Sequence, residues 1–79
     1  MRKEKKLCLI ITFHTTAEAM ETEKLCRSQA LPGRLIPAPR ELTADCGIAW
    51  CAPPEVETAL LAALAAAQVE IAGHRLTAL

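Results

Sequence analysis

The feature that most constrains the fold is a nearly all-apolar run at residues 6–13 that leads directly into a helix-starting signal. A short run that is apolar on both faces is typical of a strand buried in the middle of a sheet. After His14, the residues Thr15 and Glu18 have the spacing of a capping box, in which each side chain satisfies a free amide of the first helical turn. The chain is therefore predicted to open with a central strand and a helix.

Proline and glycine divide the rest of the chain into further elements, because Pro32-Gly33 ends a helix and Pro53-Pro54 suits the first turn of another. The predicted inward stripe of the first helix is Ala19, Thr22, Cys26 and Ala30, and that of the second is Val56, Leu60, Ala63, Leu64 and Ala67. The predicted elements are a helix at about 16–31, a short strand at 34–36, a polar loop at 38–45, a second central strand at 47–52, a helix from 53, and a closing strand at 69–76.

This order, β-α-β-β-α-β, predicts an α/β (α+β) fold of the ferredoxin-like two-layer type. With 79 residues the chain has the length of one small domain, spanning 1–79. We expect the first and third strands to be parallel neighbours. That arrangement would put Cys46 close to Lys5 and Lys6, far from His14, and at the same end of the sheet as His74.

Composition excludes several function classes. The net charge is zero and aromatic residues make up only 3%, which argues against a nucleic-acid-binding surface. No apolar run approaches the ~18 residues of a membrane span. The N-terminus has the layout of an export signal, with Ala17-Glu18-Ala19 as the cleavage site, but cleavage there would remove the best predicted strand. We therefore expect a cytoplasmic protein.

The four cysteines fall into two groups. Cys8, Cys26 and Cys51 lie within apolar patterns and are predicted, with Trp50, to be buried and reduced. Cys46 follows a polar loop and is predicted to be exposed. An even number of cysteines could also form a disulfide framework, but there is no CxxC and no zinc-type spacing, so neither a metal nor a cofactor is predicted.

The neighbours of Cys46 could support thiol chemistry. A thiolate is the nucleophilic form of cysteine, and a cation such as Arg40, six residues earlier, would favour it. Gly47 would allow a close approach of a substrate to the backbone, or a positive φ. Asp45 has the opposite effect to Arg40, because it disfavours a second negative charge. A chance surface thiol is the alternative interpretation of Cys46.

Two motifs resemble those of the selenium/sulfur carrier-like family of small proteins. Residues 12–16 read Thr-Phe-His-Thr-Thr, and residues 35–42 read Leu-Ile-Pro-Ala-Pro-Arg-Glu-Leu before Cys46-Gly47. The resemblance covers residues 7 to 76 and implies a small domain with one exposed cysteine, here Cys46, and one arginine, here Arg40. Sulfur-relay proteins with Cys-Pro at a helix start differ, since Cys46 is followed by glycine and leads into a strand.

The function expected from the resemblance is that of a carrier rather than an enzyme. Cys46 would hold sulfur or selenium as a persulfide-type adduct, with Arg40 and Gly47 at the site. The implied partners are a donor enzyme of the cysteine desulfurase type and an acceptor protein, with no nucleic acid or membrane, and a homo-oligomer is compatible with this.

Two alternatives remain at this point. One is a non-catalytic interaction or regulatory module that uses the edge strand at 34–36. The other is disulfide chemistry between Cys46 and Cys51, which a strand disfavours, because five residues span about 16 Å.

Overall fold

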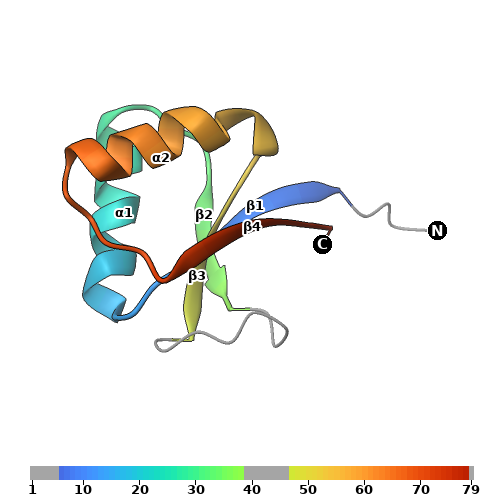
Figure 1. Ribbon diagram of the computed structural model, residues 1–79, viewed down its shortest axis with the longest axis horizontal. Helices are drawn as coiled ribbons and strands as arrows, with labels where there is room; N and C mark the ends of the chain where they lie inside the picture. The colour runs from blue at the N-terminus through green and yellow to red at the C-terminus, as the bar shows by residue number, and fades with distance from the viewer. Residues whose placement is uncertain (1–5, 39–46, 79) are drawn as a thin grey trace.

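The computed structural model describes residues 6–38 and 47–78, which form a four-stranded sheet with two helices (Figure 1). In chain order the elements are β1 (Leu7–Thr12), α1 (Thr16–Ser28), β2 (Arg34–Pro37), β3 (Ile48–Ala52), the short 3-10 helix η1 (Pro54–Val56), α2 (Glu57–Ala66) and β4 (Gly73–Ala78). The strand order is β2-β3-β1-β4, and every neighbouring pair is antiparallel. The predicted mixed α+β class and the element order are confirmed.

The capping box at the start of α1 forms as predicted. The Thr15 hydroxyl accepts a hydrogen bond from the Glu18 amide at 3.3 Å, and the Glu18 carboxylate accepts one from the Thr15 amide at 3.3 Å. The same carboxylate oxygen also accepts a hydrogen bond from the His14 amide at 2.8 Å. Glu18 thus satisfies two backbone donors at the turn between β1 and α1, which determines where the helix begins.

The main core lies between the sheet and the two helices. Leu9 and Ile11 of β1 and Trp50 of β3 point to this side, where residues of both helices meet them. The buried members of this cluster are Leu9, Ile11, Phe13, Ala19, Cys26, Trp50, Ala52, Leu60 and Leu64. The prediction of buried Trp50 and Cys26 is confirmed. We call this side of the sheet the helix face.

Both helices are shorter than predicted. The helix α1 ends at Ser28, and Ala30 is exposed with a φ of 56°, so Ala30 is not part of the buried stripe. Thr22 remains in that stripe because its hydroxyl donates to the Glu18 carbonyl at 2.9 Å. Along α2 the buried positions are Leu60, Ala63 and Leu64, while Ala67 is exposed and lies beyond the helix.

The closing strand is shifted from the predicted range 69–76 to Gly73–Ala78. The apolar side chains of Val69 and Ile71, which suggested a strand, pack against the main core from the connection after α2. No helix among the described residues is long and apolar enough to cross a membrane.

The expected direction of β3 is wrong. β1 and β3 are neighbours, as predicted, but they are antiparallel, with Thr12 opposite Ala49 and Leu9 opposite Ala52. The reason is the connection: β3 follows β2 as an antiparallel neighbour, and β2 runs parallel to β1 with β3 between them. The start of β3 therefore lies at the end of β1, the reverse of the expected placement.

Candidate functional site

The structure places only part of the predicted carrier site. Cys46 and Arg40 lie outside the described residues, as do Lys5 and Asp45. Gly47, the third predicted site residue, is described: it is exposed and immediately precedes β3. Among the predicted site residues, Gly47 is therefore the one whose geometry can be described, together with the adjacent strand ends.

Gly47 has the conformation expected of a glycine at this position. Its φ is 73°, in the left-handed region where residues with a Cβ are strained, and a Cβ placed on it would meet no atom within 4 Å. Its carbonyl accepts a hydrogen bond from the Ala38 amide at 2.9 Å. Gly47 therefore presents open backbone next to position 46, while its carbonyl is held against the end of β2.

Lys6 and His14 are placed differently from the prediction, whereas His74 lies, as predicted, at the end of the sheet where β3 starts. Because β1 and β3 are antiparallel, Lys6 lies at the opposite end of the sheet from Gly47, and His14 lies beyond the end of β1 that adjoins the start of β3. His74 is the second residue of β4, not a late one, and lies opposite Ile11. Its Nδ1 is 3.7 Å from a carboxylate oxygen of Glu57, so the imidazole contacts α2.

The second face of the sheet, opposite the helix face, carries a pattern that the sequence did not reveal. Arg34, Cys51, Ile10 and Arg75 lie directly opposite one another across the four strands. Side chains that are opposite in register share a face. Ile10 and Ala49 form a small buried cluster there, packed by Cys8, Ile36, Ala38 and Cys51.

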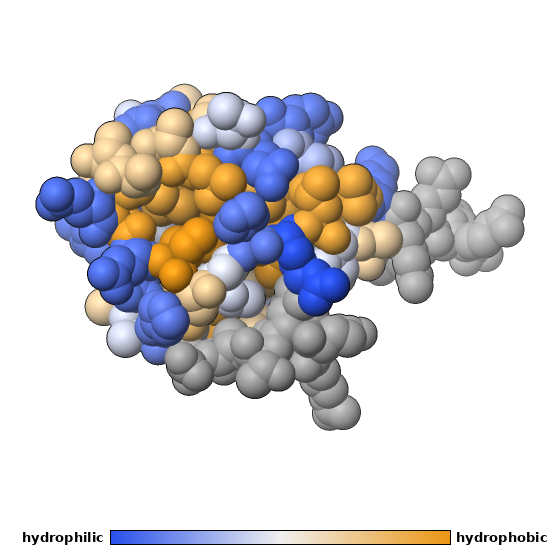
Figure 2. All heavy atoms as spheres, in the orientation of Figure 1, coloured by the Kyte–Doolittle hydropathy of each residue, from blue (hydrophilic) through white to orange (hydrophobic). Residues whose placement is uncertain are grey.

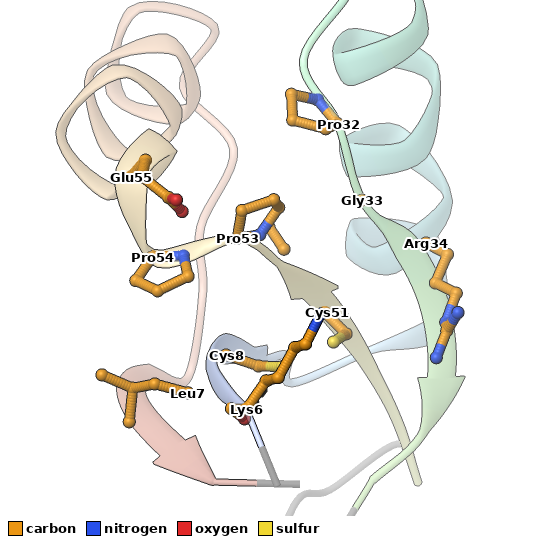
Figure 3. A pocket seen from close by; sticks show the side chains of 11 residues that line it. Lys6, Leu7, Cys8, Pro32, Gly33, Arg34, Cys51, Pro53, Pro54 and Glu55 are labelled. Carbon is orange, nitrogen blue, oxygen red and sulfur yellow. Dashed lines mark hydrogen bonds between the residues drawn. The ribbon is translucent and has the colours of Figure 1, made fainter. Parts of the chain in front are cut away.

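Cys8 and Cys51 meet on this second face. Cys51 lies opposite Ile10, so Cys8 is its diagonal neighbour, two residues along β1. The Cys8 thiol donates a hydrogen bond to the Lys6 carbonyl at 3.5 Å, and the Cys8 and Cys51 side chains line the same cavity. In Figure 3 the two side chains project from neighbouring strands into one opening. Both are half-buried and pack against the small cluster of Ile10 and Ala49, so they are less buried than predicted.

A cavity of about 590 Å³ opens over this thiol pair. It lies where β1 and β2 begin and β3 ends, and Lys6, Arg34 and Glu55 are its charged lining residues (Figure 3). The other lining residues are Leu7, Cys8, Pro32, Gly33, Cys51, Ala52, Pro53 and Pro54. The cavity thus combines two thiols with two cations and one carboxylate.

Burial and the neighbouring thiol of Cys8 favour the protonated form of Cys51. Burial raises the pKa of Cys51 above its ordinary value of 9.0, and the hydrogen bond and charge of Cys8 raise it further, while the positive charge of Arg34 lowers it. Cys26, in the main core, has a pKa raised by burial alone. Cys51 and Cys26 are therefore thiols at neutral pH. Arg34 is the group that favours the thiolate of Cys51.

Surface hydropathy adds one feature. Figure 2 shows apolar surface in patches that hydrophilic side chains interrupt on the face turned to the viewer. Leu7, Met20 and Leu76 are the large apolar residues exposed within the described part of the chain. Leu7 and Leu76 lie on the adjacent strands β1 and β4, two residues out of register.

Within residues 6–38 and 47–78, no group of three or more His, Cys, Asp and Glu side chains could hold a metal ion.

Residues 8–74 match the model of the family described as "Putative Se/S carrier protein-like", which covers most of the chain and includes the Cys46-Gly47 pair. The protein belongs to this family, as the sequence motifs predicted. Curated proteins and solved structures gave no significant match.

Proposed function

We propose that this protein is a carrier that holds sulfur or selenium on Cys46 and passes it to an acceptor. The observation that carries the proposal is the family match over residues 8–74, which spans both Cys46 and Gly47. The open, left-handed backbone at Gly47 supports it, because a bulky donor thiol can approach position 46 without meeting a side chain at position 47.

The proposed loading step is a transfer between sulfur atoms. The Cys46 thiolate attacks the terminal sulfur of a donor persulfide, the donor's S–S bond breaks, and the donor leaves as a thiolate while Cys46 becomes a persulfide. The Arg40 guanidinium would stabilise the anion, and the donor is an enzyme of the cysteine desulfurase type. Delivery to the acceptor repeats the exchange, so the protein acts as a relay in the cytoplasm rather than as an enzyme.

We also propose that residues 1–79 form one ferredoxin-like domain. The order β2-β3-β1-β4 supports this proposal, because each helix connects two strands that have one other strand between them, and both helices pack on the helix face. In this arrangement Gly47 lies at the end of the sheet where α1 begins, and positive helix N-termini favour anions.

The test is intact mass after incubation with a cysteine desulfurase and cysteine, with selenocysteine as a second substrate. Wild type should gain one reducible sulfur or selenium, Cys46→Ser should gain none, and the matched control Cys51→Ser should load as wild type does. An adduct of equal abundance on Cys46→Ser would remove Cys46 as the cargo residue.

The interaction module remains as a second candidate, favoured by the exposed Leu7 and Leu76 and by the sheet edges at β2 and β4. The two candidates differ in their need for the thiol. A binding module keeps its partner when Cys46 is replaced by serine, whereas a carrier loses its function. Complementation of a deletion strain by Cys46→Ser would therefore favour the module.

A further inference from the structure

The Cys8–Cys51 pair on the second face has no part in the proposed carrier chemistry of Cys46, and its geometry indicates what it could bind. Diagonal neighbours in antiparallel strands have Cα atoms about 7–8 Å apart, whereas a disulfide requires about 4.4–6.8 Å. Yet the two side chains line one cavity and project toward the same opening (Figure 3). The site therefore disfavours a direct S–S bond but suits one inserted atom that bonds to both sulfurs.

The charges around the pair indicate the form in which that atom arrives. Lys6 and Arg34 line the cavity with two positive charges against the single negative charge of Glu55. Arg75 extends the basic row on the same face, opposite Ile10. A net positive cavity attracts an oxyanion and disfavours a soft metal cation, although thiolates are otherwise good ligands for such cations.

We propose that Cys8 and Cys51 form a second thiol site that captures selenium from selenite as a bridged adduct, Cys8–S–Se–S–Cys51. Two molecules of a small thiol R–SH supply the remaining electrons. The balanced reaction joins the two protein thiols, two R–SH and H₂SeO₃, and yields the bridged adduct, one disulfide R–S–S–R and three waters. Selenium is reduced by four electrons, and four thiol sulfurs each lose one.

The roles of the surrounding residues follow from this chemistry. Arg34 favours the thiolate of Cys51 that attacks selenium and also attracts the oxyanion. The hydrogen bond from Cys8 to the Lys6 carbonyl keeps the second sulfur at the same opening. The cavity has room for the small thiol that must leave selenium when the second protein sulfur bonds to it.

The experiment incubates the reduced full-length protein with selenite and glutathione and follows its intact mass. Wild type should gain one selenium and lose two hydrogens. After denaturation, iodoacetamide should then alkylate only two of its four cysteines, Cys26 and Cys46. Cys8→Ser and Cys51→Ser should each lose the bridged product, while Cys46→Ser should form it, which separates this site from the proposed carrier site.

The alkylation count on wild type needs no variant, so the proposal can be overturned even if a cysteine variant fails to fold. Arg34→Gln should slow capture about twofold to fivefold, the effect of one partly exposed charge, and Arg34→Lys should restore most of the rate. Four alkylated cysteines, an adduct that retains glutathione on one sulfur, or capture that persists in Cys51→Ser would each overturn the proposal. So would binding of phenylarsine oxide by the pair without capture of selenium.

Discussion

At the level of single residues, Gly33 lies against the indole ring of Trp50. A Cβ on Gly33 would collide with Trp50 Nε1 and would come within 2.6 Å of Cε2, and the φ of 146° adds backbone strain. Trp50 is only 2% exposed and cannot move freely. Gly33→Ala should therefore lower the free energy of unfolding by about 1–3 kcal/mol, the usual range for overpacking.

The measurement is urea unfolding followed by the fluorescence of Trp50, the single tryptophan of the chain. The matched control is Gly73→Ala, where the nearest atom to the added Cβ is Thr12 Oγ1 at 3.6 Å, an ordinary contact. Gly73→Ala should change stability far less than Gly33→Ala. Equal losses in the two variants would show that the indole does adapt to a side chain at position 33.

A second residue-scale prediction concerns alkaline pH. Burial raises the folded-state pKa of Cys26 above its ordinary value of 9.0. At a pH below 9.0 the thiol is protonated in both the folded and the unfolded state, so its contribution to stability is fully present. Above pH 9.0 the unfolded chain ionises first, so stability is lost as the pH rises through the folded-state pKa.

Urea unfolding from pH 7.5 to about pH 10.5 would show this loss. The stability of wild type should fall over the upper part of the range, and the fall should be less steep in Cys26→Ala, whatever the stability of that variant at pH 7.5. The contribution of Cys51, whose pKa is raised mainly by burial, should appear as a further reduction of the slope in the double variant Cys26→Ala/Cys51→Ala. Parallel curves for wild type and variants would contradict the assignment.

At the scale of elements, the capping box determines where α1 starts. The Thr15 side chain accepts from the Glu18 amide, so Thr15→Ala leaves an amide of the first turn without this partner. The expected loss is about 1 kcal/mol, the usual effect of removing an N-cap. Thr16→Ala is the matched control, because Thr16 is exposed at the first helical position. Thermal unfolding by circular dichroism should separate the two variants, and equal melting temperatures would contradict the cap's role.

Elements with a local cause could be predicted from the sequence, whereas their relative direction could not. The capping box, the strand at the start of the chain and the burial of Trp50 depend on neighbouring residues, and they formed as expected. The direction of β3 depends on the non-local pairing of β2 with β3, and a wrong choice there misplaced Lys6 and His14 relative to the start of β3. Antiparallel pairing suits a short β2–β3 connection, which was the available signal.

The proximity of Cys8 and Cys51 was not predicted from the sequence, for a related reason. Cys8 and Cys51 each occupy a position in an apolar strand, and a single strand does not show which of its faces a helix covers. Their contact depends on the register between β1 and β3, which places Cys51 opposite Ile10. Alternation within each strand could have put Cys8 and Ile10 on one face, but only the register adds Cys51 to it.

At the scale of the whole molecule, Gly47 and the Cys8–Cys51 pair lie toward opposite ends of the sheet. Gly47, beside Cys46, precedes the first residue of β3, whereas Cys51 lies near the last residue of β3 and faces the cavity at the start of β1. Cys26 is buried in the main core, on the helix face of the sheet. The described part of the chain therefore presents thiols of different character: two half-buried thiols at the cavity and one buried thiol between the sheet and the helices.

The central claim is that Cys46 is the cargo residue, and limited loading tests it most directly. The reduced protein is incubated with a desulfurase and less than one equivalent of isotopically labelled cysteine, denatured, alkylated, and cleaved with trypsin and chymotrypsin, which separate Cys46 from Cys51 at Trp50. If Cys46 is the cargo residue, the labelled sulfur should appear first on Cys46 and never on Cys26. Label distributed over Cys8, Cys46 and Cys51 alike, or found on the Cys8–Cys51 pair alone, would contradict it.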